Sequence, residues 1–168
     1  MALSYSLDKV GPICRSAADA AIVFNYIHGT DGKDGSAVNM PFNYTPNKDI
    51  KKLKIAYAKN YFDKIKDTSR NEFKVLEEFK KLGVQLIPVN FPDSGVYNFN
   101  IMDVVIGVEC AAQFDEMTRM NIDDILTRQT KNDWPNSFRT ARFVPAVEYI
   151  NAQRHRYTLM QKVNEVMQ

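Results

Sequence analysis

The sequence is poor in the residues that build disulfide frameworks and metal sites. It has only two cysteines in 168 residues, Cys14 and Cys110, and only two histidines, His28 and His155. Two distant cysteines provide no disulfide scaffold, and neither histidine has a second ligand at a metal-binding spacing. We therefore expect no metal and no cofactor, and a reducing compartment such as the cytoplasm.

Long apolar runs and a strong excess of one charge are missing as well. No apolar stretch is longer than about five residues, as at 104–108, and such a stretch is far too short to cross a membrane. Lysine and arginine total 22 against 20 aspartate and glutamate residues, so the basic excess typical of nucleic-acid-binding proteins is absent. There is also no Gly-rich phosphate loop and no Gly-x-Ser-x-Gly nucleophile motif. We expect neither a membrane nor a nucleic acid as a direct partner.

What remains is an ordinary globular composition with 45% apolar residues, enough for one domain with a real core. An apolar strand pattern over 53–58 precedes Ser69 and Glu72, which have the spacing of a helical capping box. The helix that follows is expected to end at Gly83, and a second strand pattern covers 84–89. This order predicts an α/β fold with a parallel βαβ unit at about 53–89.

Helical spacing of apolar residues predicts several further helices around this unit. Ser16 is suited to cap the first of them, and Pro145 suits the first turn of the last. The expected elements are a helix over 16–28, a long loop over 29–50, helices over 101–117 and 145–167, and an irregular segment over 120–143 with room for a short helix near 122–130.

Two charged residues interrupt apolar helix faces. Arg156 lies in the middle of a stripe on the last helix, and Glu109 lies on the apolar face of the helix over 101–117. A buried charge costs several kcal/mol, on the order of the desolvation penalty, unless it is paired. Two interpretations remain open: a structural ion pair of Glu109 with Arg156 or Arg142, or a charge that faces a pocket.

Four segments in order resemble the amidase signature family. Residues 6–34 read SLDKVGPICRSAADAAIVFNYIHGTDGKD, which is similar to the Ser-Leu-Asp-x-x-Gly-Pro-x-x-Arg segment that follows the family's Gly/Ser-rich signature. The other three are Met40–Tyr44 (MPFNY), residues 108–119 (VECAAQFDEMTR) and residues 134–156 (WPNSFRTARFVPAVEYINAQRHR). The resemblance covers essentially the whole chain and implies part of an α/β/α layered fold.

The resemblance also implies which parts of the enzyme the chain lacks. Family members carry a catalytic Lys, a bridging cis-Ser and a nucleophilic Ser upstream of the matching segment, and this sequence has no Ser-Ser pair and no Gly/Ser-rich run. We therefore expect residues 1–168 to be a single-domain piece of a larger amidase, without its catalytic N-terminal part and its C-terminal end. On its own the chain is predicted to be inactive, with no catalytic residue.

The resemblance further implies a site and a substrate class. Arg156 aligns with an arginine that holds the substrate's carboxylate in the matching component of tRNA-dependent amidotransferases, the A subunit, and Gln153 lies one turn before it. The parent is expected to be a stand-alone amidase of a small carboxamide. The alternatives are the A subunit of a tRNA-dependent amidotransferase and a naturally shortened module with a binding or structural role.

The truncation leads to one more expectation about the surface. Helices over 101–117 and 145–167 carry apolar residues on more than one face, and the strands belong to a larger sheet in the family. The chain should therefore show either a self-association interface, as in a homo-oligomer, or an exposed apolar patch with Arg156 or Glu109 near its rim.

Overall fold

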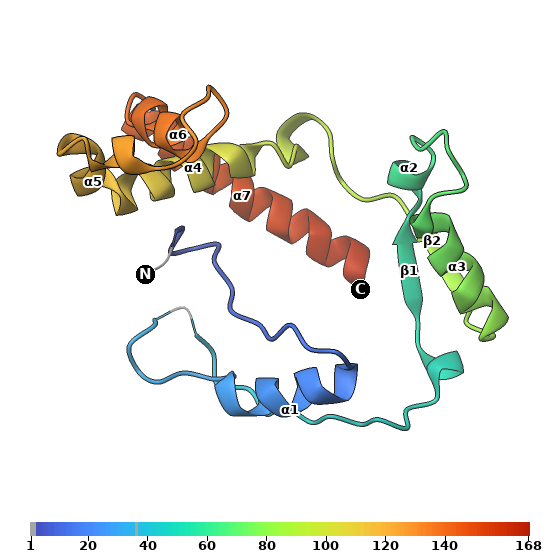
Figure 1. Cartoon of the computed structure of the whole chain (residues 1–168). Helices are drawn as coiled ribbons and strands as arrows, with labels where there is room; N and C mark the ends of the chain where they lie inside the picture. The colour runs from blue at the N-terminus through green and yellow to red at the C-terminus, as the bar shows by residue number, and fades with distance from the viewer. Residues whose placement is uncertain (1–2, 36) are drawn as a thin grey trace.

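The structure, a computed structural model, describes residues 3–35 and 37–168 and is mainly helical with one small sheet (Figure 1). Its helices and strands are α1 (Ala17–Ile27), β1 (Ile55–Ala58), α2 (Lys59–Phe62), α3 (Asn71–Lys81), β2 (Leu86–Val89), α4 (Ile101–Gln113), α5 (Asp115–Arg119), α6 (Trp134–Ala141) and α7 (Ala146–Met167). The described residues also form three short 3₁₀ helices, which are η1 (Ile50–Lys52), η2 (Gly95–Tyr97) and η3 (Ile122–Ile125).

The predicted βαβ unit is confirmed. Strands β1 and β2 pair in parallel, with Ile55 opposite Leu86 and Ala58 opposite Val89. Helices α2 and α3 form the crossover between them, as parallel pairing requires. Among the described residues these are the only two strands, so the mixed α/β character is present without the layered sheet of a complete α/β/α fold.

The predicted capping box at the start of α3 is wrong. Arg70, and not Ser69, is the N-cap residue of this helix, and its side chain makes no capping hydrogen bond. The Ser69 hydroxyl instead donates to the Asp67 carboxylate at 2.6 Å, and Glu72 pairs with Arg70. The physical reason is that α3 begins one residue later than the box requires, so Ser69 precedes the N-cap and Asp67 holds its side chain outside the helix.

Helix α1 follows its prediction closely. The backbone N–H of Asp19 donates to the Ser16 hydroxyl at 3.1 Å, so Ser16 is the N-cap. Beyond the helix, Gly29 adopts a left-handed conformation with φ of 92°, which suits glycine. Phe24 packs edge-on against Phe42 from the loop that follows, with ring centroids 4.9 Å apart. This small contact is the main packing of α1, which leaves most of its surface exposed.

The core lies between α4, α6 and α7. Its buried residues include Val105 and Cys110 on α4, Phe138 on α6, and Ala152 and Leu159 on α7. The expected single helix over 101–117 is interrupted at Phe114, where α4 ends and α5 begins. The helix over 145–167 is confirmed as α7, with Pro145 as its N-cap residue.

Helix α6 lies in the segment that was expected to be irregular, so that prediction is corrected. Pro135 occupies its first turn, where a missing backbone N–H costs nothing. Phe138 stacks on Trp134 within the helix and on Phe114 from the α4–α5 junction, with centroids 5.8 and 4.8 Å apart. Tertiary packing of two rings therefore stabilises a short helix whose other residues are mostly polar.

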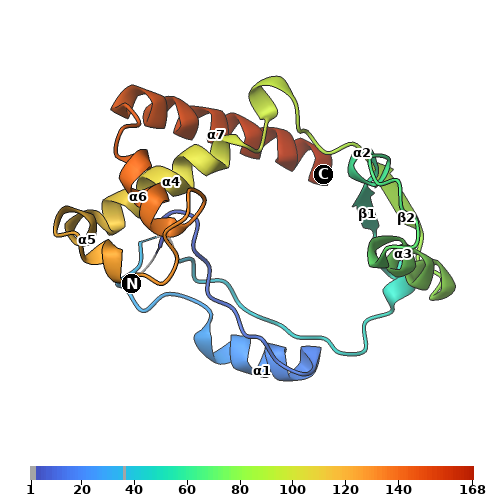
Figure 2. The same cartoon turned by 45° about the horizontal axis from the view of Figure 1, so that its top comes forward.

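The molecule is open rather than closely packed. Figure 2 shows α1 and the βαβ unit standing apart from the helical layer and connected to it by extended segments. The accessible surface is 13059 Å². A compact monomer of this mass exposes about 8,500 Å². Apolar side chains account for part of the excess, and among the exposed ones are Val10, Ile13, Tyr26, Met160 and Met167. The predicted uncovered apolar surface is therefore present.

Candidate functional site

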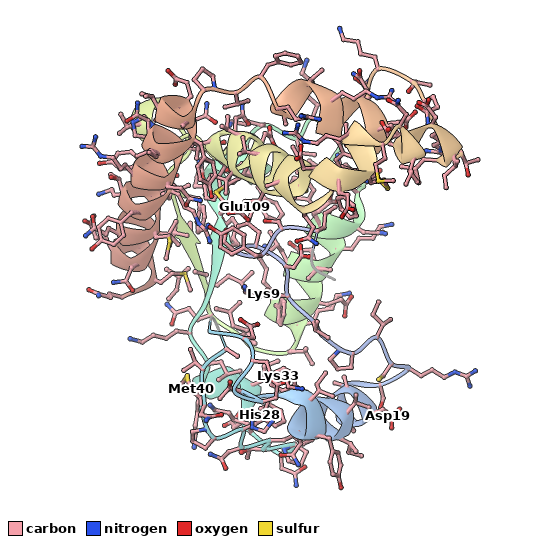
Figure 3. The ribbon with its side chains drawn as sticks, turned by 90° about the vertical axis from the view of Figure 1, so that its left-hand side faces the viewer. Lys9, Asp19, His28, Lys33, Met40 and Glu109 are labelled. Carbon is pink, nitrogen blue, oxygen red and sulfur yellow. The ribbon has the colours of Figure 1, made fainter. Side chains whose placement is uncertain are left out.

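Glu109 stands at the centre of the polar contacts in the helical layer. It lies on α4 and retains only 4% of its accessible surface. Figure 3 shows it on the side of α4 that faces the N-terminal segment. The sequence predicts this position because the glutamate interrupts an apolar helical face, and burial of that face takes the carboxylate out of water.

Five hydrogen bonds satisfy the Glu109 carboxylate. Oε2 accepts from the Ser4 hydroxyl and from the backbone N–H of Ser6 at 3.1 Å. Oε1 accepts from the Ser6 hydroxyl at 2.7 Å, the Tyr149 hydroxyl at 3.1 Å and the Gln153 amide at 3.3 Å. Three segments that are far apart in the sequence, residues 3–8, α4 and α7, thus meet at one carboxylate.

The hydrogen bonds decide the charge state of this group. Burial acts to raise the pKa of Glu109, but the bonds from Ser4, Ser6 and Tyr149 favour the charged form and leave the pKa below its ordinary value. Burial, together with hydrogen bonding to Tyr5 and the nearby carboxylate, raises the pKa of Tyr149 to about 12. At neutral pH Glu109 is therefore ionised, and Tyr149 is a neutral donor.

Arg156 reaches the same cluster from α7 without touching the carboxylate. Its Nη1 donates to the Ser6 hydroxyl at 2.7 Å, and its Nη2 donates to the Ser6 backbone carbonyl at 3.0 Å. The predicted direct ion pair with Glu109 is wrong, because Ser6 lies between the two charges. Arg142, the other candidate partner, lies 3.4 Å from Asp115 instead.

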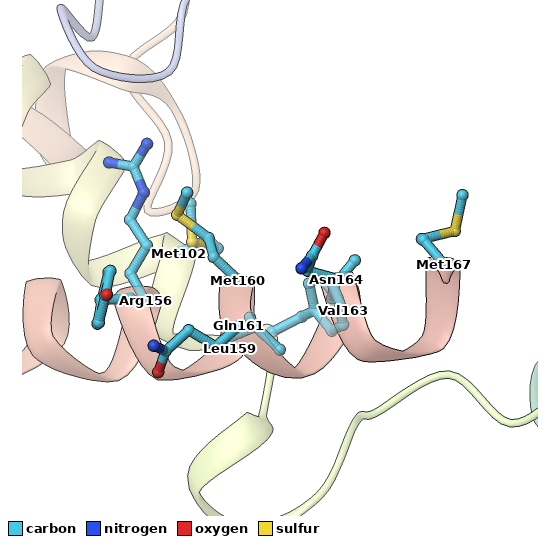
Figure 4. Close-up of a pocket in the computed structure, with 10 residues that line it drawn as sticks. Met102, Arg156, Leu159, Met160, Gln161, Val163, Asn164 and Met167 are labelled. Atoms are coloured by element: carbon cyan, nitrogen blue, oxygen red, sulfur yellow. The ribbon is translucent and has the colours of Figure 1, made fainter.

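Arg156 also lines a pocket, which agrees with the other interpretation. A groove of about 840 Å³ runs along α7 and is mostly apolar. Its lining includes Phe99, Met102, Arg156, Leu159, Met160, Val163 and Met167. Figure 4 shows Arg156 near one end of this row of side chains and Met167 at the other. The guanidinium is thus a single cation at the end of an apolar surface.

The two residues predicted to bind substrate differ in their placement. Arg156 lines the groove, whereas Gln153 lies outside the lining and donates to the Tyr149 hydroxyl at 2.8 Å and to Glu109. The Gln153 carbonyl oxygen is 3.5 Å from Nη1 of Arg156. Sequence reasoning missed Ser6 and Tyr149. A sequence signal was available for Tyr149 alone, because Tyr149, Gln153 and Arg156 follow one another at spacings of four and three residues.

The arrangement contains no metal cluster. Among residues 3–35 and 37–168, no group of three histidine, cysteine, aspartate or glutamate side chains could hold a metal ion. Within the same residues, no helix has the length and apolar character needed to cross a membrane.

Comparison with known sequences decides the family. Residues 1–168 match the Amidase family over their whole length. The chain belongs to the Amidase family. This confirms the resemblance carried by the segments at 6–34, 40–44, 108–119 and 134–156.

Several curated relatives are named as the A subunit of glutamyl-tRNA(Gln) amidotransferase. The protein from Campylobacter concisus is 36% identical over 96 residues, which are 55% of this chain and 21% of the relative. The protein from Campylobacter hominis is 28% identical over 150 residues, 88% of this chain and 33% of the relative. The chain thus spans between about a fifth and a third of the length of these relatives. No solved structure matches it significantly.

The Ser6 hydroxyl of this Amidase-family chain is held from two sides. The Ser6 hydroxyl donates to a carboxylate, which makes Ser6 resemble a nucleophile with a base. However, the hydrogen bonds that hold the pKa of Glu109 below its ordinary value make it a poor proton acceptor at neutral pH. The same hydroxyl oxygen also accepts from Arg156, which lowers its electron density. The cluster therefore fixes the Ser6 hydroxyl in place between Glu109 and Arg156.

Proposed function

We propose that residues 1–168 form the substrate-binding side of an amidase that hydrolyses small carboxamides, with the nucleophile and its base supplied from outside these residues. One observation carries the proposal. Arg156 presents a guanidinium at the end of an apolar groove while Ser6 holds it through two of its nitrogens. The family membership and the greater length of the relatives support the same interpretation.

In this proposal one side of the enzyme carries out the catalytic steps, and the other side, residues 1–168, binds the substrate. On the other side, a serine oxygen attacks the carboxamide carbon while a lysine, acting through a bridging cis-serine, takes the serine proton. The C–N bond then breaks, the proton passes to the leaving nitrogen, and ammonia departs. Water hydrolyses the resulting ester and restores the serine. Residues 1–168 contribute the groove that holds the rest of the substrate during both steps.

Arg156 is the residue that we propose to bind a substrate carboxylate. A guanidinium offers paired donors that match a carboxylate, and an apolar surrounding strengthens the contact. Gln153 belongs to the same proposed site, since its carbonyl oxygen lies beside Nη1 of Arg156 and its amide supports Glu109. We propose a small amide that carries a carboxylate as the substrate class.

The first prediction tests binding with two matched amides. Succinamate carries a carboxylate, and succinamide replaces it with a second neutral amide. In NMR titrations of the 168-residue chain, succinamate should shift groove resonances and bind about tenfold or more tightly than succinamide, as expected for one charge-assisted contact. Arg156→Ala should remove this preference. Arg154→Ala is the matched control, because Arg154 is an exposed arginine on the same helix.

The same preparation should release no ammonia from either amide, because the proposal places the nucleophile outside these residues. Turnover that persists through a second, independent purification would overturn the proposal that the nucleophile and its base lie outside these residues. Equal binding of succinamate and succinamide, or unchanged selectivity in Arg156→Ala, would overturn the role of Arg156.

The naming of the relatives favours one alternative. They are called subunits of an amidotransferase, so the same groove could belong to such a complex rather than to a stand-alone amidase. A naturally shortened module with a binding role is the third option. The DNA upstream distinguishes them: an in-frame Gly/Ser-rich signature supports a catalytic parent, neighbouring genes for partner subunits support the amidotransferase, and a stop codon supports the module.

A further inference from the structure

We propose that Glu109 is a positioning residue that orients Arg156 through Ser6, without contacting the guanidinium itself. The inference rests on the proposed function only for its consequence, which is that the orientation matters for carboxylate binding. We use the word relay for the two sets of hydrogen bonds that link Glu109 to Ser6 and Ser6 to Arg156. These bonds do not depend on the proposed function.

The hydroxyl of Ser6 is the first part of the relay. It has one proton, and it donates that proton to Oε1 of Glu109 at 2.7 Å. Its lone pairs then remain for Nη1 of Arg156, also at 2.7 Å. The carboxylate accepts but cannot donate, so it sets the direction of the Ser6 O–H bond. A neutral donor in its place would leave that hydroxyl free to turn.

The backbone of Ser6 is the second part. Its N–H donates to Oε2 of Glu109 at 3.1 Å, and its carbonyl accepts from Nη2 of Arg156 at 3.0 Å. Glu109 therefore holds Ser6 on one side by both backbone and side chain, and Ser6 holds Arg156 on the other side in the same two ways. The Ser4 hydroxyl, fully buried, secures the same segment to Oε2.

The relay explains why a carboxylate, and not an amide, occupies this position. Both oxygens of Glu109 accept from Ser6, one from the hydroxyl and one from the backbone N–H. A glutamine of the same shape would present an NH₂ group to one of these donors. At least one of the two contacts would be lost, and a half-buried donor of Ser6 would lose its acceptor.

Rotation of the Arg156 guanidinium provides the readout. Because Nη1 and Nη2 have different acceptors on Ser6, rotation about the Nε–Cζ bond breaks both hydrogen bonds at once. In ¹⁵N NMR of the 168-residue chain, Glu109→Gln should speed this rotation by about tenfold, the factor that corresponds to one lost net hydrogen bond. Ser6→Ala should speed it as well, and Ser6→Thr, which keeps the hydroxyl, should restore slow rotation.

The control is Glu116→Gln, which removes an exposed carboxylate on α5 and should leave the rotation unchanged. A Glu109→Gln variant with a native-like spectrum and wild-type rotation would overturn the inference. If that variant does not fold, Ser6→Ala decides, because it keeps Glu109 and removes only the hydroxyl, and unchanged rotation there would also overturn the relay. If rotation responds while succinamate fails to bind the wild type, the relay stands and the proposed function fails.

Discussion

Two buried carboxylates in this chain are stabilised in different ways. Glu109, 4% exposed, accepts five hydrogen bonds from neutral groups and makes no ion pair among the described residues. Asp123, 1% exposed in η3, relies on Arg139, whose Nη2 lies 2.6 Å from its Oδ2. Within the described residues, neither carboxylate oxygen of Asp123 accepts a hydrogen bond of good geometry.

The difference separates a contact between neighbouring elements from one that joins distant segments. Asp123 and Arg139 lie in neighbouring elements, η3 and α6, and their pair holds the end of the helical layer together. Glu109 contacts Ser4 across 105 residues of sequence and joins three separate segments. A nondirectional charge pair is sufficient to close a turn, whereas directed hydrogen bonds also fix the orientation of the groups that they join.

The largest expected effect is on stability at Asp123. Arg139→Met would leave a buried carboxylate without its cation and should lower the free energy of unfolding by about 1–3 kcal/mol, the loss being reduced because the Arg139 side chain is 39% exposed. The matched change Arg156→Met should cost about 1 kcal/mol or less, because Glu109 keeps its own donors. Urea unfolding followed by fluorescence of Trp134, the single tryptophan, measures both. Equal losses would contradict the comparison.

The next effect is a pH dependence specific to Glu109. Burial opposes ionisation, but the serine and tyrosine donors outweigh it, so the folded-state pKa lies below the ordinary 4.5. Stability from this group is therefore complete above that value and is lost as the pH falls through the folded-state pKa. Hydrogen-exchange protection of the Ser6 amide, corrected for the intrinsic rate, should fall by about tenfold on acidification. Glu109→Gln should show no such step.

The smallest effect is expected for Tyr149→Phe. This change removes one of the five donors to Glu109 and should lower the free energy of unfolding by about 0.5–1.5 kcal/mol. It should also remove the phenol that titrates at about pH 12, which ultraviolet absorbance can follow. A loss larger than that of Arg139→Met would mean that the network around Glu109 is more cooperative than its separate bonds suggest.

Local patterns account for what the sequence predicts correctly. The parallel βαβ unit, the Ser16 cap and the helix that ends at Met167 depend on periodicity and on residues close in the chain. Helix α6 was missed because its stability comes from Phe114, outside its own segment. The predicted capping residue of α3 was wrong because the helix begins one residue later than the spacing indicates, and Asp67 holds the Ser69 side chain outside it.

The site was predictable only in part. Glu109 and Arg156 were singled out because each breaks an apolar helical pattern, and this required no knowledge of the fold. Their common partner Ser6 could not be identified, because its contacts with them span 103 and 150 residues. Such contacts are set by how the segments pack in three dimensions. The family resemblance identified matching segments, but it did not identify Ser6 as the residue that lies between Glu109 and Arg156.

The 150-residue separation between Ser6 and Arg156 also affects when their contact can form during translation. Residues 3–8 leave the ribosome long before their partners on α7, because Arg156 follows Ser6 by 150 residues. Contacts this distant in sequence form late, because a long loop must close before they yield any free energy. A nascent chain can assemble the βαβ unit early, while the groove and the cation fixed at its end form only after α7 has been translated.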